Sequence, residues 1–175
     1  GLGLLGSIPP LSLAAMWGRT ETVKARTETV KALLKAGANP NTPVKIGLGL
    51  LLSGTPLSSA AKNGHTEMVV ALLKAGANPN TPFTKGLGLL GSDTPLARAA
   101  DKGHAEMVGA LLAAGADPKA PKWDKWWDHG TLETPLELAT KKGHVAVFRQ
   151  LRKHDGETMS WADLWSLAGA KLWSS

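Results

Sequence analysis

The chain has 175 residues, a net charge of +6 and no cysteine. This length allows one domain or a short series of stacked units, and the missing cysteine excludes disulfides, thiolate metal sites and cysteine nucleophiles. No apolar run approaches the roughly 20 residues of a transmembrane helix, and the apolar residues 1–6 lack the basic region of a signal peptide. We therefore expect a cytoplasmic protein.

A seven-residue segment is duplicated without change near the N-terminus. Arg-Thr-Glu-Thr-Val-Lys-Ala occurs at 19–25 and again at 26–32. Seven residues make nearly two helical turns, so one helix can contain both copies with its apolar stripe almost in phase. Three outcomes stay open: a copy that loops out, a lengthened helix with a reshaped connection to the first helix, and a first helix that swings away and exchanges between chains. We favour the lengthened helix.

The rest of the chain repeats itself every 39 or 40 residues. Copies begin with Thr-Pro-Leu at 55, 94 and 134, and a looser copy begins at Pro10. The threonine is placed to cap a helix whose first turn contains the proline, and the glycine of a following Gly-His ends this helix in a left-handed turn. A second helix with apolar residues at helical spacing follows, and it also ends at glycine. One such unit cannot bury its apolar face alone, so the units must stack.

This pattern resembles the ankyrin repeat family, whose units contain Thr-Pro-Leu-His, Gly-His and Gly-Ala-Asp. The resemblance extends to about residue 153. It departs from the family at the histidine after Thr-Pro-Leu, which is replaced by Ser12, Ser58, Ala97 and Glu137. The hydrogen bonds that usually brace the first helix are therefore not expected in their usual form.

The segments before each Thr-Pro are six or seven residues longer than in the family, whose period is 33 residues. Residues 45–53 and 85–92 are rich in leucine and glycine, and residues 1–7 repeat the same pattern. The alternation of Val44, Ile46, Leu48 and Leu50 is typical of a strand. We expect elongated hairpins in which equivalent leucines of adjacent repeats stand side by side. This leucine ladder would either join the hairpins or form an exposed apolar patch.

The third hairpin differs because Trp123, Trp126 and Trp127 stand among charged residues. Tryptophan is enriched at binding hot spots, although it is also suited to a core, so at least one of the three is expected to pack against the stack.

The C-terminal segment is predicted to form one further helix. Ser160 and Asp163 resemble a capping box, and an apolar stripe follows at helical spacing. The stripe consists of Trp161, Leu164, Trp165, Ala168 and Leu172. We expect a helix at 160–173 that covers the open end of the stack, with a partner-binding helix as the alternative.

We predict an all-α repeat solenoid with β-hairpin fingers, in the form of an ankyrin-like stack of about four helix-turn-helix repeats with elongated hairpins and a C-terminal capping helix. It forms a single domain of residues 1–175. The expected parts are repeat 1 at about 8–45 with the duplicated heptads at 19–32, repeat 2 at about 54–84, repeat 3 at about 93–121, repeat 4 at about 133–154, and the capping helix at 160–173.

No residue pattern in the sequence is typical of catalysis. His65, His104 and His144 occur once per repeat in the Gly-His position, so each is expected to support its own turn, and the three cannot gather on one metal. No Ser-His-acid set, phosphate-binding loop or catalytic carboxylate pair stands out. We expect no enzyme activity, no cofactor, no metal and no small-molecule substrate.

The resemblance implies a non-catalytic scaffold for protein–protein interaction, which binds its partner through the hairpins and the exposed end of each first helix. The positive charge favours an acidic protein partner, whereas the even spread of lysines argues against nucleic acid. The implied partner-binding residues are Met16, Trp17, Lys62, Asn63, Asp101, Lys102, Lys141, Lys142, Trp123 and Trp126. Two alternatives are an engineered or structural repeat protein without a dedicated partner, and a peripheral membrane protein that binds through its leucine-rich hairpins.

Overall fold

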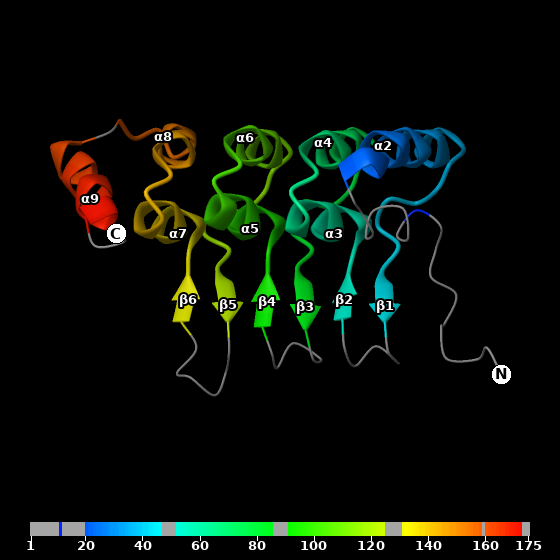
Figure 1. Cartoon of the computed structure of the whole chain (residues 1–175), viewed down its shortest axis with the longest axis horizontal. Coiled ribbons are helices and arrows are strands. Elements are labelled where there is room, and N and C mark those ends of the chain that lie inside the picture. Colours follow the sequence, from blue (N-terminus) through cyan, green and yellow to red (C-terminus); the bar gives the residue numbers. More distant parts are fainter. Residues whose placement is uncertain are drawn as a thin grey trace.

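The computed structural model describes residue 11 and residues 20–46, 52–85, 91–124, 131–158 and 160–172. Three rows of elements run along the molecule: outer helices, inner helices, and strands that project from the inner helices (Figure 1). The outer helices are α2 (Thr20–Lys35), α4 (Thr66–Lys74), α6 (Ala105–Ala113) and α8 (Val145–His154). The inner helices are α3 (Pro56–Lys62), α5 (Pro95–Lys102) and α7 (Pro135–Lys141). The strands are β1 (Val44–Ile46), β2 (Leu52–Gly54), β3 (Phe83–Lys85), β4 (Gly91–Asp93), β5 (Lys122–Asp124) and β6 (Thr131–Glu133).

The inner helices begin at the predicted threonine caps. The side chains of Thr55, Thr94 and Thr134 each accept a hydrogen bond from the backbone N–H three residues later. Ser58 and Glu137 complete capping boxes, because they accept from the backbone N–H of Thr55 at 2.8 Å and of Thr134 at 2.7 Å. Ser58 and Glu137 occupy the position of the family histidine, and they stabilise the start of their helices through capping boxes instead.

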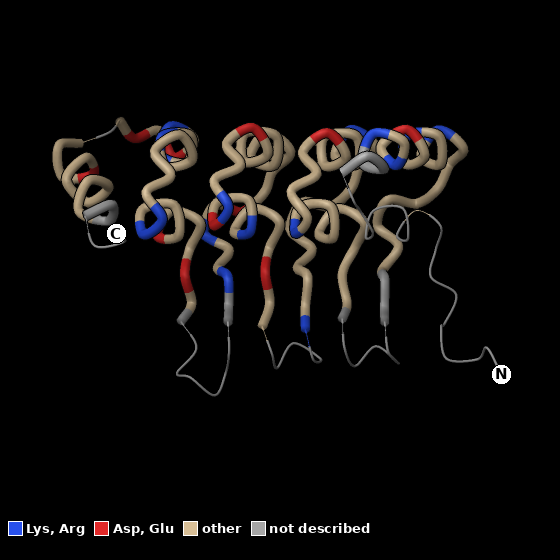
Figure 2. The backbone as a smooth tube through the Cα atoms, in the orientation of Figure 1, with Lys and Arg blue, Asp and Glu red and all other residues tan. Residues whose placement is uncertain are grey.

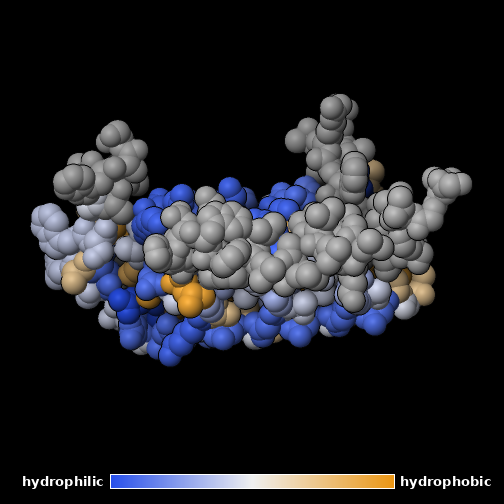
Figure 3. Space-filling model, turned by 90° about the horizontal axis from the view of Figure 1, so that it is seen from below, coloured by the Kyte–Doolittle hydropathy of each residue, from blue (hydrophilic) through white to orange (hydrophobic). Residues whose placement is uncertain are grey.

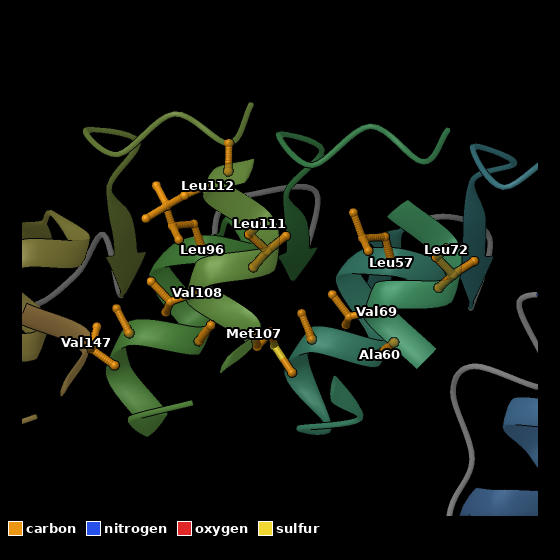
Figure 4. Packing of buried hydrophobic residues seen from close by; sticks show 14 of the residues in the cluster. Leu57, Ala60, Val69, Leu72, Leu96, Met107, Val108, Leu111, Leu112 and Val147 are labelled. Carbon is orange, nitrogen blue, oxygen red and sulfur yellow. The ribbon is translucent and has the colours of Figure 1, made fainter. Parts of the chain in front are cut away.

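The helix pairs share one continuous core. Equivalent residues of successive repeats are fully buried, among them Val69 with Val108 and Leu72 with Leu111 (Figure 4). Alanines on the inner helices are also fully buried, which allows adjacent helices to approach closely. Leu11 and Val30 belong to the same core, so each unit completes the burial of its neighbour.

The Gly-His bends connect successive repeats. Gly64 and Gly103 both have φ +75°, the left-handed conformation expected for them. The ring of His104 lies against Gly64, and the ring of His144 lies against Gly103, with ring atoms 2.9 and 2.8 Å from where a Cβ atom of the glycine would be. The rings of these two histidines thus support the bend of the preceding repeat. Their backbone N–H groups support their own bends, as expected, with bonds of 2.9 Å from His104 to the Ala99 carbonyl and 2.8 Å from His144 to the Ala139 carbonyl.

Asparagine side chains join the turns that precede the hairpins. The Asn41 amide donates to the Gly76 carbonyl at 3.1 Å and accepts from the Asn78 backbone N–H at 2.7 Å. Asn80 makes the same pair of bonds to Gly115 and Asp117, at 3.1 and 2.8 Å. The Gly-His bends lie at the N-terminal ends of the outer helices. The asparagine bonds set the spacing of successive repeats at the C-terminal ends of the same helices.

The lengthened helix predicted from the duplication is confirmed. Helix α2 has 16 residues, whereas α4 and α6 have 9 each. Residues 27–35 correspond to α4, so the seven additional residues lie at the N-terminal end of α2. A looped-out copy is therefore excluded. The helix expected to precede α2 lies outside the described residues, apart from Leu11.

The hairpins form one six-stranded antiparallel sheet in the order β1-β2-β3-β4-β5-β6. Neighbouring hairpins pair through different strands, since Ser53 of β2 stands opposite Thr84 of β3 and Ser92 of β4 stands opposite Trp123 of β5. Equivalent residues are therefore two strands apart, at about 10 Å. The expected side-by-side arrangement is wrong for the described strands, because the returning strand of each hairpin intervenes. Most leucines of the proposed ladder lie outside the described residues.

Helix α9 (Trp161–Leu172) confirms the predicted C-terminal helix. Its capping box is present: Asp163 accepts from the Ser160 backbone N–H at 2.8 Å, and Ser160 Oγ accepts from the Asp163 backbone N–H at 3.2 Å. Arg152 of α8 also binds Asp163, at 2.7 Å. Asp163 and Leu167 face the stack, whereas Trp161, Leu164, Trp165 and Ala168 of the expected apolar stripe are exposed, Trp161 to 80% and Trp165 to 76%. The expectation that the stripe packs on the stack is wrong for these four residues, and the side chain of Leu172 lies outside the described residues.

The histidine contact can be tested with two alanine substitutions. Gly103→Ala introduces backbone strain of about 1–2 kcal/mol and a Cβ atom that clashes with His144. Gly115→Ala is the matched control, because φ is +83° but no atom lies within 4 Å of its Cβ position. Urea denaturation followed by circular dichroism should show that Gly103→Ala costs at least about 1 kcal/mol more of the unfolding free energy. Equal losses would contradict a contribution from the histidine contact.

Candidate protein-interaction surface

The predicted binding residues on the helices lie at the C-terminal ends of the inner helices. Lys62, Asp101 and Lys141 occupy equivalent positions near the ends of α3, α5 and α7, and Asn63, Lys102 and Lys142 follow them. Figure 2 shows basic residues recurring on these helices beside the strands. The stacking of repeats thus brings residues about 40 positions apart in sequence into two parallel rows, the anchored row (Lys62, Asp101, Lys141) and the exposed row (Asn63, Lys102, Lys142).

Lys62 is held over an aromatic ring. Its ammonium lies 4.1 Å from the centroid of the Phe83 ring, and Phe83 is buried at the start of β3. Partial burial lowers the pKa of Lys62, and the nearby charges of Lys85 and Arg98 lower it further. The side chain therefore has a defined position on the surface, with cation–π attraction that offsets part of its lost hydration.

Asp101 lies in a network of charges between α5 and the strands. Its carboxylate is 3.6 Å from Arg98 Nη1 and 3.4 Å from Lys122 Nζ, and Arg98 also binds Asp93. All four side chains are between 4% and 13% exposed. The charge of Asp101 is consequently used within the protein, where it positions Arg98 and Lys122.

The remaining predicted residues differ in their accessibility. Lys141 pairs with Glu133 at 2.7 Å, but its side chain is 65% exposed. Asn63, Lys102 and Lys142 are exposed. Met16, Trp17 and Trp126 lie outside the described residues, and Trp123 is placed only by its backbone in β5.

Leu132 is a surface residue that the sequence reasoning missed. Its side chain is 66% exposed, and in the pairing of β5 with β6 it stands opposite Trp123. The equivalent residues of the other hairpins are Ser53 and Ser92, so a comparison of the repeats could have revealed it. Seen from the hairpins, the described surface is mostly hydrophilic with small separate apolar areas (Figure 3), so an exposed leucine here is a distinctive feature.

The comparison with protein families agrees with this architecture. A family model for ankyrin repeats, comprising three copies, matches residues 24–122. The chain belongs to the ankyrin repeat family. Ankyrin repeats generally mediate protein–protein interactions, and the family is typically non-catalytic. No curated protein matches the chain.

Within the described ranges, no three histidine, aspartate or glutamate side chains are grouped so that they could hold a metal ion. In the same part of the chain, no helix has the length and apolar character needed to cross a membrane. What the described residues do present is an ordered arrangement of charges beside the hairpins.

The charge network should contribute to stability. Replacing Asp93 with alanine leaves the buried guanidinium of Arg98 with a single acidic neighbour, and we expect a loss of about 3 kcal/mol in unfolding free energy. Lys141→Met is the control, because it removes an exposed ion pair worth less than about 1 kcal/mol. Thermal and urea denaturation would measure both, and a similar small loss for the two variants would contradict the role assigned to the network.

Proposed function

We propose that this ankyrin-repeat chain is a non-catalytic scaffold that binds an acidic protein segment across its hairpins and the ends of α3, α5 and α7. The observation that carries the proposal is the contrast between the two rows defined above. Lys62 and Asp101 of the anchored row are fixed by contacts within the protein, Lys141 forms an exposed ion pair with Glu133, and the exposed row is open to solvent. Such an arrangement offers a partner a surface whose charges need little rearrangement on binding.

The charge of this surface favours an acidic partner. Lys102, Lys141 and Lys142 are exposed, whereas Asp101 is neutralised by its two basic neighbours. Exposed charges of one sign accelerate the encounter with a partner of opposite charge and discriminate against partners of like charge. Binding should therefore weaken as salt concentration rises.

An exposed leucine at one end of the sheet supports the same proposal. Trp123 and Leu132 are directly opposite in the pairing of β5 with β6, and Leu132 is exposed. Aromatic residues surrounded by polar ones are common anchors of protein interfaces. Trp126, Met16 and Trp17 would extend this surface along the hairpins and the first repeat.

We also infer a stack of four repeats that ends at α9. Leu11 and α2 supply the first repeat, and the three helix pairs from α3 to α8 supply the others. The contacts of Leu167 with the core and of Asp163 with Arg152 support a role of α9 in covering the last pair.

The proposal can be tested by affinity capture from cell extract with the intact chain. The double variant Lys102→Glu with Lys142→Glu should lose most of the captured protein, and Leu132→Asp should weaken its binding by about tenfold or more. Lys153→Glu, which places the same charge change on the outer helix α8, should leave capture unchanged.

Two results would contradict the proposal. Capture of nothing by the intact chain would favour a structural repeat protein without a partner. Flotation of the chain with liposomes, in the absence of a protein partner, would favour membrane binding through the hairpins.

A further inference from the structure

A second surface lies on the opposite side of the helices. Between α2 and α4, on the solvent side of the outer row, an open groove has a volume of about 560 Å³. It is lined by Lys31, Leu34, Lys35, Glu67, Val70, Ala71, Lys74 and Ala75. We propose that this outer groove binds an acidic amphipathic helix of a partner protein, independently of the hairpin surface.

The floor of the outer groove is apolar, although the stacking of repeats does not require apolar residues on this side of α4. Helix α4 buries Val69 and Leu72 in the core, yet Val70 and Ala71 line the groove on its other side. The outer face of a surface helix is normally polar. The other repeats show that the fold does not require valine here, since the position of Val70 is taken by Lys31, Gly109 and Arg149.

The rim of the outer groove is positively charged. Lys35 and Lys74 stand at the C-terminal ends of α2 and α4, and neither makes an ion pair with any residue that the structure describes. Lys31 is different, because it binds Glu28 at 2.9 Å and Glu67 at 2.8 Å. Hydrogen bonds to these two carboxylates raise the pKa of Lys31 to about 12. The two unpaired lysines flank the apolar floor, and carboxylates on the occupant would complement their positive charge.

The duplicated heptad extends this rim. Lys24 and Lys31 are the same position of the two copies, and residues seven apart lie on nearly the same face of a helix. Lys24, Lys31 and Lys35 thus form a line along α2 of about 16 Å, at 1.5 Å per residue. A helix of about 11 residues, or three turns, matches that length.

The shape of the outer groove favours a helix over a small molecule. The lining residues of each helix recur at intervals of three or four, so the groove runs along the helix axes. None of these residues is fully buried, and the groove stays open to solvent, whereas small-molecule sites enclose most of their ligand. An amphipathic helix can place apolar residues at i, i+3, i+4 and i+7 on the floor and acidic residues toward Lys35 and Lys74.

The test uses a synthetic 16-residue helical peptide with leucine at i, i+3, i+4 and i+7 and glutamate beside the leucines. Fluorescence anisotropy should show saturable binding to the full chain, and no binding of the same peptide with lysine in place of glutamate. Val70→Glu should weaken binding at least about tenfold, because it puts a like charge on the apolar floor. Lys74→Glu, which is exposed and preserves the helix, should weaken it about threefold to tenfold at low salt and less at high salt.

The matched control is Lys153→Glu, at the position of α8 equivalent to Lys74 and outside the outer groove; it should change binding less than about twofold. Circular dichroism would verify that each variant is folded. Absence of saturable binding, or equal weakening by Lys74→Glu and Lys153→Glu, would overturn the proposal. Two other results would also overturn it. If the chain dimerises and Val70→Glu abolishes the dimer, the groove binds a second copy. If the peptide does not bind but phosphatidylserine vesicles do, and Val70→Glu abolishes this binding, the groove binds a membrane.

Discussion

A pair of short helices in this protein can bury its apolar side only against the next pair. An outer helix such as α4 has nine residues, too few for stability in water on its own, and its buried side chains contact those of the helices on either side. Every other feature must keep the repeats at the distance that this packing requires. Buried alanines allow the approach, the His104 and His144 rings fill the space over neighbouring glycines, and Asn41 and Asn80 hold successive turns together.

The sequence predicted those parts of the fold that depend on local signals. Threonine caps, left-handed glycines and helical periodicity act within one repeat, so Thr55, Gly64 and the stripe around Val69 were recognisable without any neighbour. The lengthened α2 was also predictable, because seven residues preserve helical phase. The pairing of β2 with β3 was not, since it depends on how two hairpins meet and no residue pattern within either hairpin fixes that.

The same limit applies to the candidate site. The repeat alignment placed Lys62, Asp101 and Lys141 in one row, but it could not show that Asp101 faces Arg98 and Lys122 while Lys141 stays exposed. Helix α9 is the clearest case. Its apolar stripe is present, but Asp163 is bound by Arg152 of α8, and this contact holds the face of α9 that carries Asp163 and Leu167 against the stack. Polar contacts between elements, which periodicity does not record, decided the orientation.

The length of α2 shows how a packed helix can gain residues and keep its contacts with the next helix. An inserted segment of five residues would rotate everything before it by about 140° and bring polar residues to the core side, whereas seven residues rotate it by only about 20°. Growth of a packed helix therefore proceeds in steps of whole turns. Since the additional residues of α2 lie beyond the end that corresponds to α4, the step left the contacts between the two helices in register. A repeat array can in this way acquire new surface by lengthening one helix, without altering the fit between that helix and the next outer helix.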